Sequence, residues 1–154
     1  MRNTPNSIVE PRSQSFPGER IAPLVLVVED HQDTRELYNF VLTAHHYQVV
    51  EVDDGEIAVG LVEQLSPDVI LMDTHLPTLD GLGAAERIRA SGRKDVPIIF
   101  ISGNADPALK LAALNAGGDD YLLKPISLVD LEAAVARSLD RSERSLSRAR
   151  KVSQ

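Results

Sequence analysis

Short apolar runs alternate along the chain with segments in which apolar residues recur at helical spacing. The runs are "LVLVV" (24–28), "YQVVEV" (47–52), "DVILM" (68–72), "VPIIFIS" (96–102) and "DYLLK" (120–124). The segments after them carry apolar faces with a period near 3.6 residues: Leu37, Phe40, Val41 and Ala44; Ala58, Leu61, Val62 and Leu65; Leu82, Ala85 and Ile88; Leu109, Ala112, Ala113 and Ala116; Leu128, Leu131, Val135 and Leu139. Near-continuous apolar strands that alternate with helices predict a doubly wound (βα)5 protein of the α/β class. Its five-stranded parallel sheet would be covered by helices on both faces.

Residues that favour helix ends flank several of these segments. Asp33 and Glu36 have the spacing of a capping box at the start of the first predicted helix. Pro107 suits the first turn of the fourth helix, and Ser127 suits the N-cap of the last one. The sequence "AGG" (116–118) is typical of a helix stop.

The chain divides into one folded region with a tail at each end. Residues 1–20 are rich in Pro, Ser and Asn and have almost nothing apolar to bury, which predicts a disordered tail. Residues 21–140 contain all the periodic segments and form one domain. Residues 141–154 are basic, and we expect either a fraying helical extension or a disordered tail.

Composition excludes several classes of function. The 154 residues contain no Cys, so disulfides, thiolate metal sites and thiol catalysis are absent. No apolar segment resembles a secretion signal or approaches the length of a membrane span, which predicts a cytoplasmic protein without membrane insertion. The net charge of −7 argues against nucleic acid as the direct partner.

Polar side chains converge at one edge of the predicted sheet. In an open parallel sheet, ligands bind beyond the carboxyl ends of the strands. The first run ends in Glu29 and Asp30, the third in Asp73, the fourth in Ser102 and the fifth in Lys124. Neighbouring carboxylates repel unless a cation lies among them, and all-oxygen ligands suit Mg²⁺. A carboxylate beside Mg²⁺ and an ammonium is well placed to attack a phosphoryl group.

Two histidines stand close to this edge in the sequence. His31 follows the first pair of carboxylates, and the pattern there is more typical of a solvated loop residue than of a ligand. His75 comes two residues after Asp73, but one histidine without a second nearby is a poor metal site.

Four motifs and their spacing resemble a known family. They are "VVED" (27–30), "LMDTHLPTLDG" (71–81), "FISG" (100–103) and "AGGDDYLLKP" (116–125). Through them residues 22–140 resemble the receiver domain of two-component response regulators, the chemotaxis-regulator-like family. The resemblance implies a flavodoxin-like fold with strand order 2-1-3-4-5.

The resemblance also implies a phosphoacceptor site. Asp73 would accept phosphate from a histidine kinase or a histidine phosphotransfer protein. Glu29, Asp30, Asp73 and the backbone carbonyl of His75 would bind Mg²⁺. Such a protein is not an enzyme beyond catalysing its own phosphorylation and dephosphorylation.

A conformational response is implied by three further residues. Lys124 would pair with the phosphoryl group, Ser102 would move toward it, and Tyr121 would be the switch aromatic whose ring then enters from solvent. Pro125 would follow a cis peptide bond. The face made by the fourth helix, fifth strand and fifth helix would then bind a downstream protein partner or form a homodimer.

Other functions fit the sequence less well. A Mg²⁺-dependent phosphatase of the haloacid dehalogenase type expects a second Asp at the position of His75. A flavodoxin-like cofactor binder expects a phosphate loop where the acidic "EDHQDT" (29–34) stands. A degenerate receiver that ignores phosphate is disfavoured because every expected site residue is present. Only residues 141–154 follow the domain, so we expect a single-domain regulator.

Overall fold

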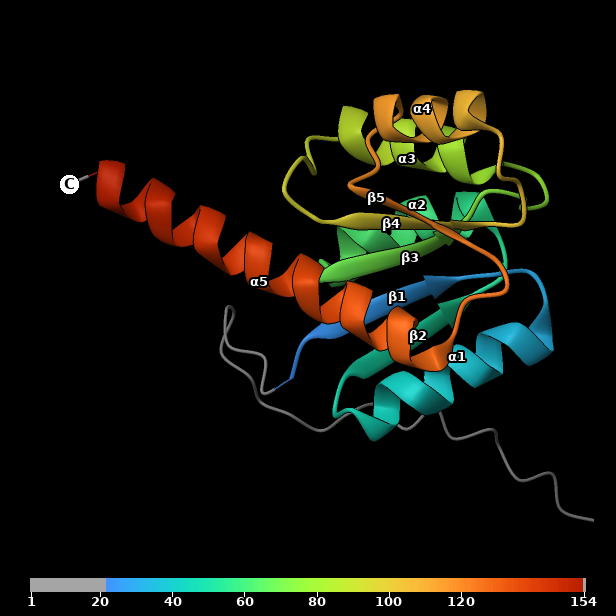
Figure 1. The fold of residues 1–154 in the computed structure, drawn as a ribbon. Helices are drawn as coiled ribbons and strands as arrows, with labels where there is room; N and C mark the ends of the chain where they lie inside the picture. Colours follow the sequence, from blue (N-terminus) through green and yellow to red (C-terminus); the bar gives the residue numbers. More distant parts are fainter. Residues whose placement is uncertain (1–21, 154) are drawn as a thin grey trace, which may run out of the picture.

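The computed structural model describes residues 22–153, which form a five-stranded parallel sheet with five helices (Figure 1). The strands are β1 (Leu24–Val28), β2 (Gln48–Val52), β3 (Val69–Asp73), β4 (Ile98–Ser102) and β5 (Asp120–Leu123). The helices are α1 (Gln32–Ala44), α2 (Gly55–Leu65), α3 (Gly81–Ala90), α4 (Pro107–Asn115) and α5 (Leu128–Val152). The strand order is β2-β1-β3-β4-β5, so the predicted fold class and strand order are confirmed.

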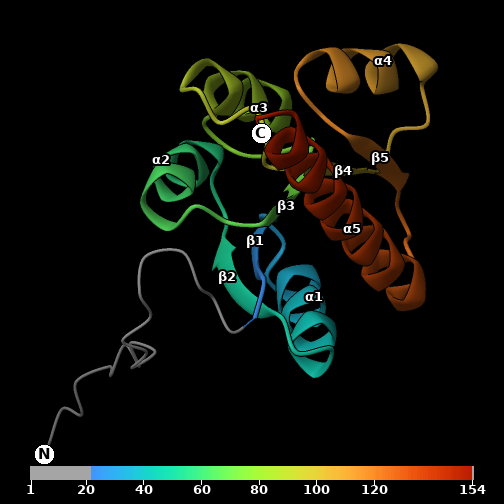
Figure 2. The ribbon, with the colours of Figure 1, turned by 90° about the vertical axis from the view of Figure 1, so that its left-hand side faces the viewer.

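The sheet separates two hydrophobic cores. Successive side chains of a strand point to opposite faces, so Leu26 and Val28 enter one core while Val25 and Val27 enter the other. The first core is completed by α2, α3 and α4, and the second by α1 and α5. In Figure 2, α2 and α3 lie on one side of the strands and α1 and α5 on the other. Burial of both faces explains why the strands are almost entirely apolar.

The start and the buried face of α1 differ from the prediction. His31 occupies the N-cap, and Asp33 lies within the first turn, so the predicted capping box is wrong. The buried residues of α1 are Tyr38, Val41 and Leu42, so the predicted face is confirmed at Val41, whereas Phe40 is 74% exposed. The face is rotated from the prediction because Tyr38 buries its ring although it carries a polar hydroxyl.

The other predicted helix ends are confirmed. Pro107 is the first residue of α4. The Ser127 hydroxyl caps α5 by accepting the Asp130 N–H at 3.0 Å. Ala116 ends α4, and Gly117 follows with a φ of +120°, a conformation that side chains other than that of glycine rarely adopt.

Helix α5 continues through residue 140 to Val152 and projects beyond the body of the domain (Figure 1). Its buried residues, Leu131, Ala134, Val135 and Ser138, all lie in the first half. The basic extension therefore takes the helical one of its two expected forms. The predicted tail of residues 1–20 lies outside the described residues. Within residues 22–153, no helix is long and apolar enough to cross a membrane.

Candidate active site

Strand pairing brings the predicted site residues to one edge of the sheet. Val28 pairs with Met72, so the residues that follow them, Glu29 and Asp73, are neighbours at the carboxyl ends of β1 and β3. Ser102 pairs with Leu123, which places Lys124 directly beyond this edge. The chain order reverses between β1 and β3, which is where open α/β sheets bind ligands.

Lys124 bridges the two buried carboxylates. Its Nζ lies 3.0 Å from Asp73 Oδ2 and 3.0 Å from Glu29 Oε1. The backbone N–H of Lys124 donates to the Ser102 carbonyl at 2.8 Å, which fixes the start of the side chain. The Lys124 ammonium therefore offsets negative charge on carboxyl groups that are buried away from water.

Burial and these contacts shift the pKa values of the two carboxyl groups in opposite directions. Burial, followed by hydrogen bonding with Asp73, raises the pKa of Glu29 to about 8 against the opposing effect of Lys124. For Asp73, burial acts in the same upward direction, but hydrogen bonds from Glu29, the His75 N–H and Lys124 outweigh it and lower its pKa. The hydrogen bonds around the two groups therefore favour the charged form of Asp73 over that of Glu29.

The loop after β3 holds Asp73 in place. The backbone N–H of His75 donates to Asp73 Oδ1 at 2.9 Å. The N–H of Gly81 donates to the Thr74 carbonyl at 3.2 Å, and a Cβ at Gly81 would overlap the Asp73 carbonyl oxygen. Only glycine fits here, because the start of α3 packs directly against the backbone of the Asp73 segment.

Ser102 is fully buried and has a partner that sequence analysis missed. The Ser102 Oγ accepts the Thr74 hydroxyl at 2.8 Å and the Asn104 N–H at 3.1 Å. A Thr after a strand-end Asp is also typical of an ordinary loop, so only the pairing of β3 with β4 shows that Thr74 faces Ser102.

Tyr121 does not lie in solvent. Its residue is 8% exposed, and its hydroxyl donates to the Asn104 carbonyl at 2.7 Å. The expectation that the ring starts outside and moves inward is therefore wrong for this structure, because the Asn104 carbonyl holds the hydroxyl of the inward-facing ring. The predicted cis bond between Lys124 and Pro125 is confirmed.

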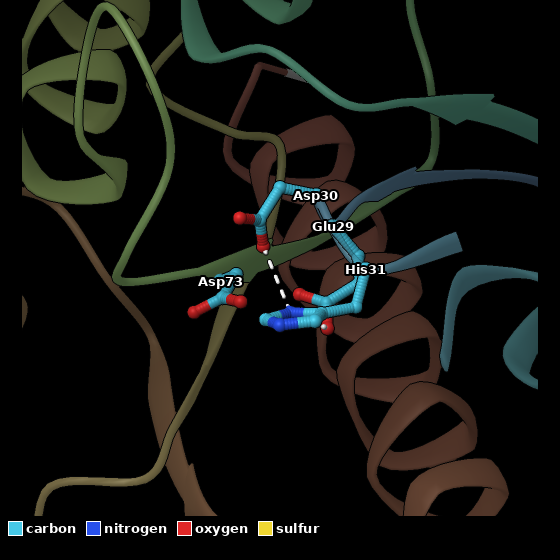
Figure 3. Close-up of side chains that lie close together, drawn as sticks. All are labelled: Glu29, Asp30, His31 and Asp73. Carbon is cyan, nitrogen blue, oxygen red and sulfur yellow. Dashed lines mark ion pairs between the residues drawn. The ribbon is translucent and has the colours of Figure 1, made fainter. Parts of the chain in front are cut away.

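Four side chains offer metal ligands at this edge. Ligand atoms of Glu29, Asp30, His31 and Asp73 all lie within 4.8 Å of one another (Figure 3). Three carboxylate donors fit Mg²⁺, which is usually held by one or two carboxylates and water. The predicted contribution of the His75 carbonyl stays a prediction. The His31 side chain is 74% exposed, and its Nδ1 lies 3.2 Å from Asp30 Oδ1.

The fold and this site define a doubly wound α/β protein with a cluster of carboxyl groups and a half-buried lysine at the switch point of its sheet. The family model described as the response regulator receiver domain matches residues 25–136. The chain therefore belongs to the receiver domain family of two-component response regulators.

Curated relatives are longer than this chain. The probable transcriptional regulator ycf27 of Guillardia theta is 38% identical over 78% of this chain and 46% of its own length. The uncharacterized transcriptional regulatory protein YrkP of Bacillus subtilis is 38% identical over 76% of this chain and 49% of its own length. The chain thus spans about half the length of these relatives.

Solved receiver domains have the same fold. The receiver domain of the sensor histidine kinase PA1611 from Pseudomonas aeruginosa, described with a magnesium ion coordinated in the active site cleft, is 36% identical. Its TM-score is 0.72, and the match covers 77% of this chain and 98% of that one. The signal receiver domain of a LuxO repressor protein from Vibrio parahaemolyticus is 27% identical, with a TM-score of 0.75 and coverages of 81% and 95%.

Proposed function

We propose that this receiver domain accepts a phosphoryl group on Asp73 from a histidine kinase or a histidine phosphotransfer protein. The observation that carries the proposal is a buried Asp73 carboxyl group at the sheet switch point, with Oδ2 3.0 Å from the Lys124 Nζ. A buried charge of this kind is costly to maintain for stability alone, whereas a nucleophile needs to be held rigidly and kept ionised.

The transfer uses groups that are already in place. A carboxylate oxygen of Asp73 attacks the phosphorus of phosphohistidine, an O–P bond forms, and the P–N bond breaks. Its electron pair stays on the donor imidazole, which becomes a neutral leaving group by taking up a proton. Lys124 lies within reach of the new phosphoryl oxygens and compensates their charge.

A divalent cation completes the site. Glu29, Asp30, Asp73 and the backbone carbonyl of His75 would hold Mg²⁺, which neutralises charge on the phosphoryl group and its carboxylate acceptor. The clustering of the three carboxylates within ligand distance supports this assignment, as does the magnesium ion described for the Pseudomonas receiver.

Phosphorylation reaches the surface through a short chain of hydrogen bonds. Ser102 Oγ accepts the Asn104 N–H, and the Asn104 carbonyl accepts the Tyr121 hydroxyl. When the Ser102 hydroxyl donates to a phosphoryl oxygen, Asn104 and Tyr121 are held in one arrangement. The α4, β5 and α5 face then favours a downstream protein partner or a second copy, because phosphate stabilises one state over the other.

Intact-mass measurement after incubation with acetyl phosphate and Mg²⁺ tests the phosphoacceptor role. Wild type should gain one phosphoryl group, Asp73→Asn should gain none, and the exposed control Asp53→Asn should behave as wild type. Equal labelling of wild type and Asp73→Asn would refute the assignment. Repeated release of phosphate from a small phosphomonoester would favour the phosphatase alternative instead.

Amide exchange with and without trifluoroberyllate, a phosphoryl mimic, tests the conformational response. The segment from Ser102 to Asn104 and the strand around Tyr121 should become more protected in wild type. Ser102→Ala should still accept phosphate but show little of this change. Identical exchange in the two states of wild type would indicate a phosphate relay without a switch.

A further inference from the structure

His31 stands at a helix end without acting there as a cap. It occupies the N-cap of α1 with an extended backbone, but its side chain makes no capping hydrogen bond. Ser, Thr, Asp and Asn are the residues that stabilise an N-cap, so the imidazole brings no gain at that position. Its side chain is 74% exposed and has free access to water, so nothing in the packing forces it toward the carboxylates.

The imidazole nevertheless turns toward the neighbouring carboxyl groups. Its Nδ1 lies 3.2 Å from Asp30 Oδ1 and 3.7 Å from Glu29 Oε1 (Figure 3). Figure 3 also shows the ring beside the Asp73 carboxyl group, and the ligand atoms of the two residues lie within 4.8 Å of each other. A histidine that merely paired with one surface carboxylate would not need to approach the buried Glu29 as well.

The spread of these atoms suits one shared ion. The ligand atoms of Glu29, Asp30, His31 and Asp73 lie within 4.8 Å of one another. Ligands that bind one first-row ion at about 2.0–2.2 Å lie at most about 4.4 Å apart, so small side-chain rotations close the set.

We propose that His31 Nδ1 is an additional ligand of this metal site and makes it prefer a first-row transition cation, such as Co²⁺, Ni²⁺ or Zn²⁺, over Mg²⁺. This inference rests on the proposed function only in that the same carboxylates would hold the metal ion. Mg²⁺ takes oxygen ligands, and a nitrogen donor adds little to its binding. Imidazole suits the later first-row cations, whose affinity for mixed nitrogen and oxygen sites exceeds that for Mg²⁺.

Calorimetric titration of the tag-free chain with Co²⁺ and with Mg²⁺ tests this selectivity. His31→Ala should weaken Co²⁺ binding at least about tenfold, a typical loss when a group supporting a metal site is removed, and leave Mg²⁺ affinity unchanged. The matched control is His75→Ala, which removes the other imidazole beside the site but keeps the backbone carbonyl of residue 75, so both affinities should stay unchanged. Asp30→Asn should weaken the binding of both cations, which would locate them at this group of side chains.

Pulsed electron paramagnetic resonance identifies the ligand directly. Mn²⁺ added to wild type should show coupling to an imidazole nitrogen, which persists in His75→Ala and disappears in His31→Ala. Unchanged Co²⁺ affinity in His31→Ala, or an equal loss for Co²⁺ and Mg²⁺, would overturn the inference. These titrations need no phosphate, so failure of phosphoryl transfer to Asp73 would be seen separately, in the mass measurement.

Discussion

The hydrogen bond between Thr74 and Ser102 gives a quantitative prediction. Both residues are buried, at 3% and 0% exposure, and their hydroxyl oxygens are 2.8 Å apart. Thr74→Val keeps the shape of the side chain and removes the donor. A net contribution of about 1 kcal/mol per buried neutral hydrogen bond predicts a loss of that size. For a chain of this length, it lowers the melting temperature by about 2–4 °C.

Ser102→Ala should cost more than Thr74→Val. It removes the acceptor shared by the Thr74 hydroxyl and the Asn104 N–H, which leaves one buried and one partly buried donor without this acceptor. An unsatisfied buried polar group costs about 1–3 kcal/mol. In the double variant Thr74 no longer has a hydroxyl to satisfy, so its loss should be smaller than the sum of the single losses by about 1 kcal/mol.

Urea unfolding followed by far-ultraviolet circular dichroism measures the cycle, since the chain has no Trp for fluorescence. Thr74→Ser retains the hydroxyl and is the matched control, so it should not lose the coupling to Ser102. Additive single losses would show that the two hydroxyls do not interact, and the account of how Ser102 is held would then be wrong. All of these variants should still accept phosphate on Asp73, because none of them changes the nucleophile.

Three further predictions concern other contacts. Gly81→Ala should destabilise the fold by about 1–3 kcal/mol, measured by urea unfolding, because its Cβ overlaps the Asp73 carbonyl oxygen. Lys124→Met should lower the melting temperature, because it leaves the Glu29 and Asp73 carboxyl groups without their shared ammonium. Added Mg²⁺ should raise the melting temperature more in this variant than in wild type. Ending the chain after Asp140 should change the free energy of unfolding by no more than about 0.5 kcal/mol, since the buried residues of α5 precede this point; a larger loss by urea unfolding would show that the extension belongs to the folded core.

Patterns with strong physical constraints were predictable from the sequence. The doubly wound sheet follows from apolar strands alternating with helices, and the convergence of Glu29, Asp73, Ser102 and Lys124 follows from their place at strand ends. Strand order is not contained in local periodicity and came only from the family resemblance. Distances within the site, such as the two 3.0 Å contacts of Lys124, come from the structure and not from these patterns.

Side-chain orientation was not predictable. The inward position of Tyr121 depends on a carbonyl acceptor at Asn104, and the partner of Ser102 depends on the register between β3 and β4. The imidazole of His31 has the same sequence context whether it faces water or the carboxylates. These features are set by contacts between segments far apart in the chain, which single-sequence patterns do not record.

Chemical mapping of the modified residue tests the central claim most directly. Borohydride reduces an acyl phosphate to the alcohol, which converts a phosphorylated Asp to homoserine. After treatment with acetyl phosphate and Mg²⁺, peptide sequencing by mass spectrometry should find homoserine at position 73 and Asp unchanged at position 30. A reduced residue at Glu29 or Asp30, or none at all in a protein that had gained phosphate, would contradict the assignment of Asp73 as the phosphoacceptor.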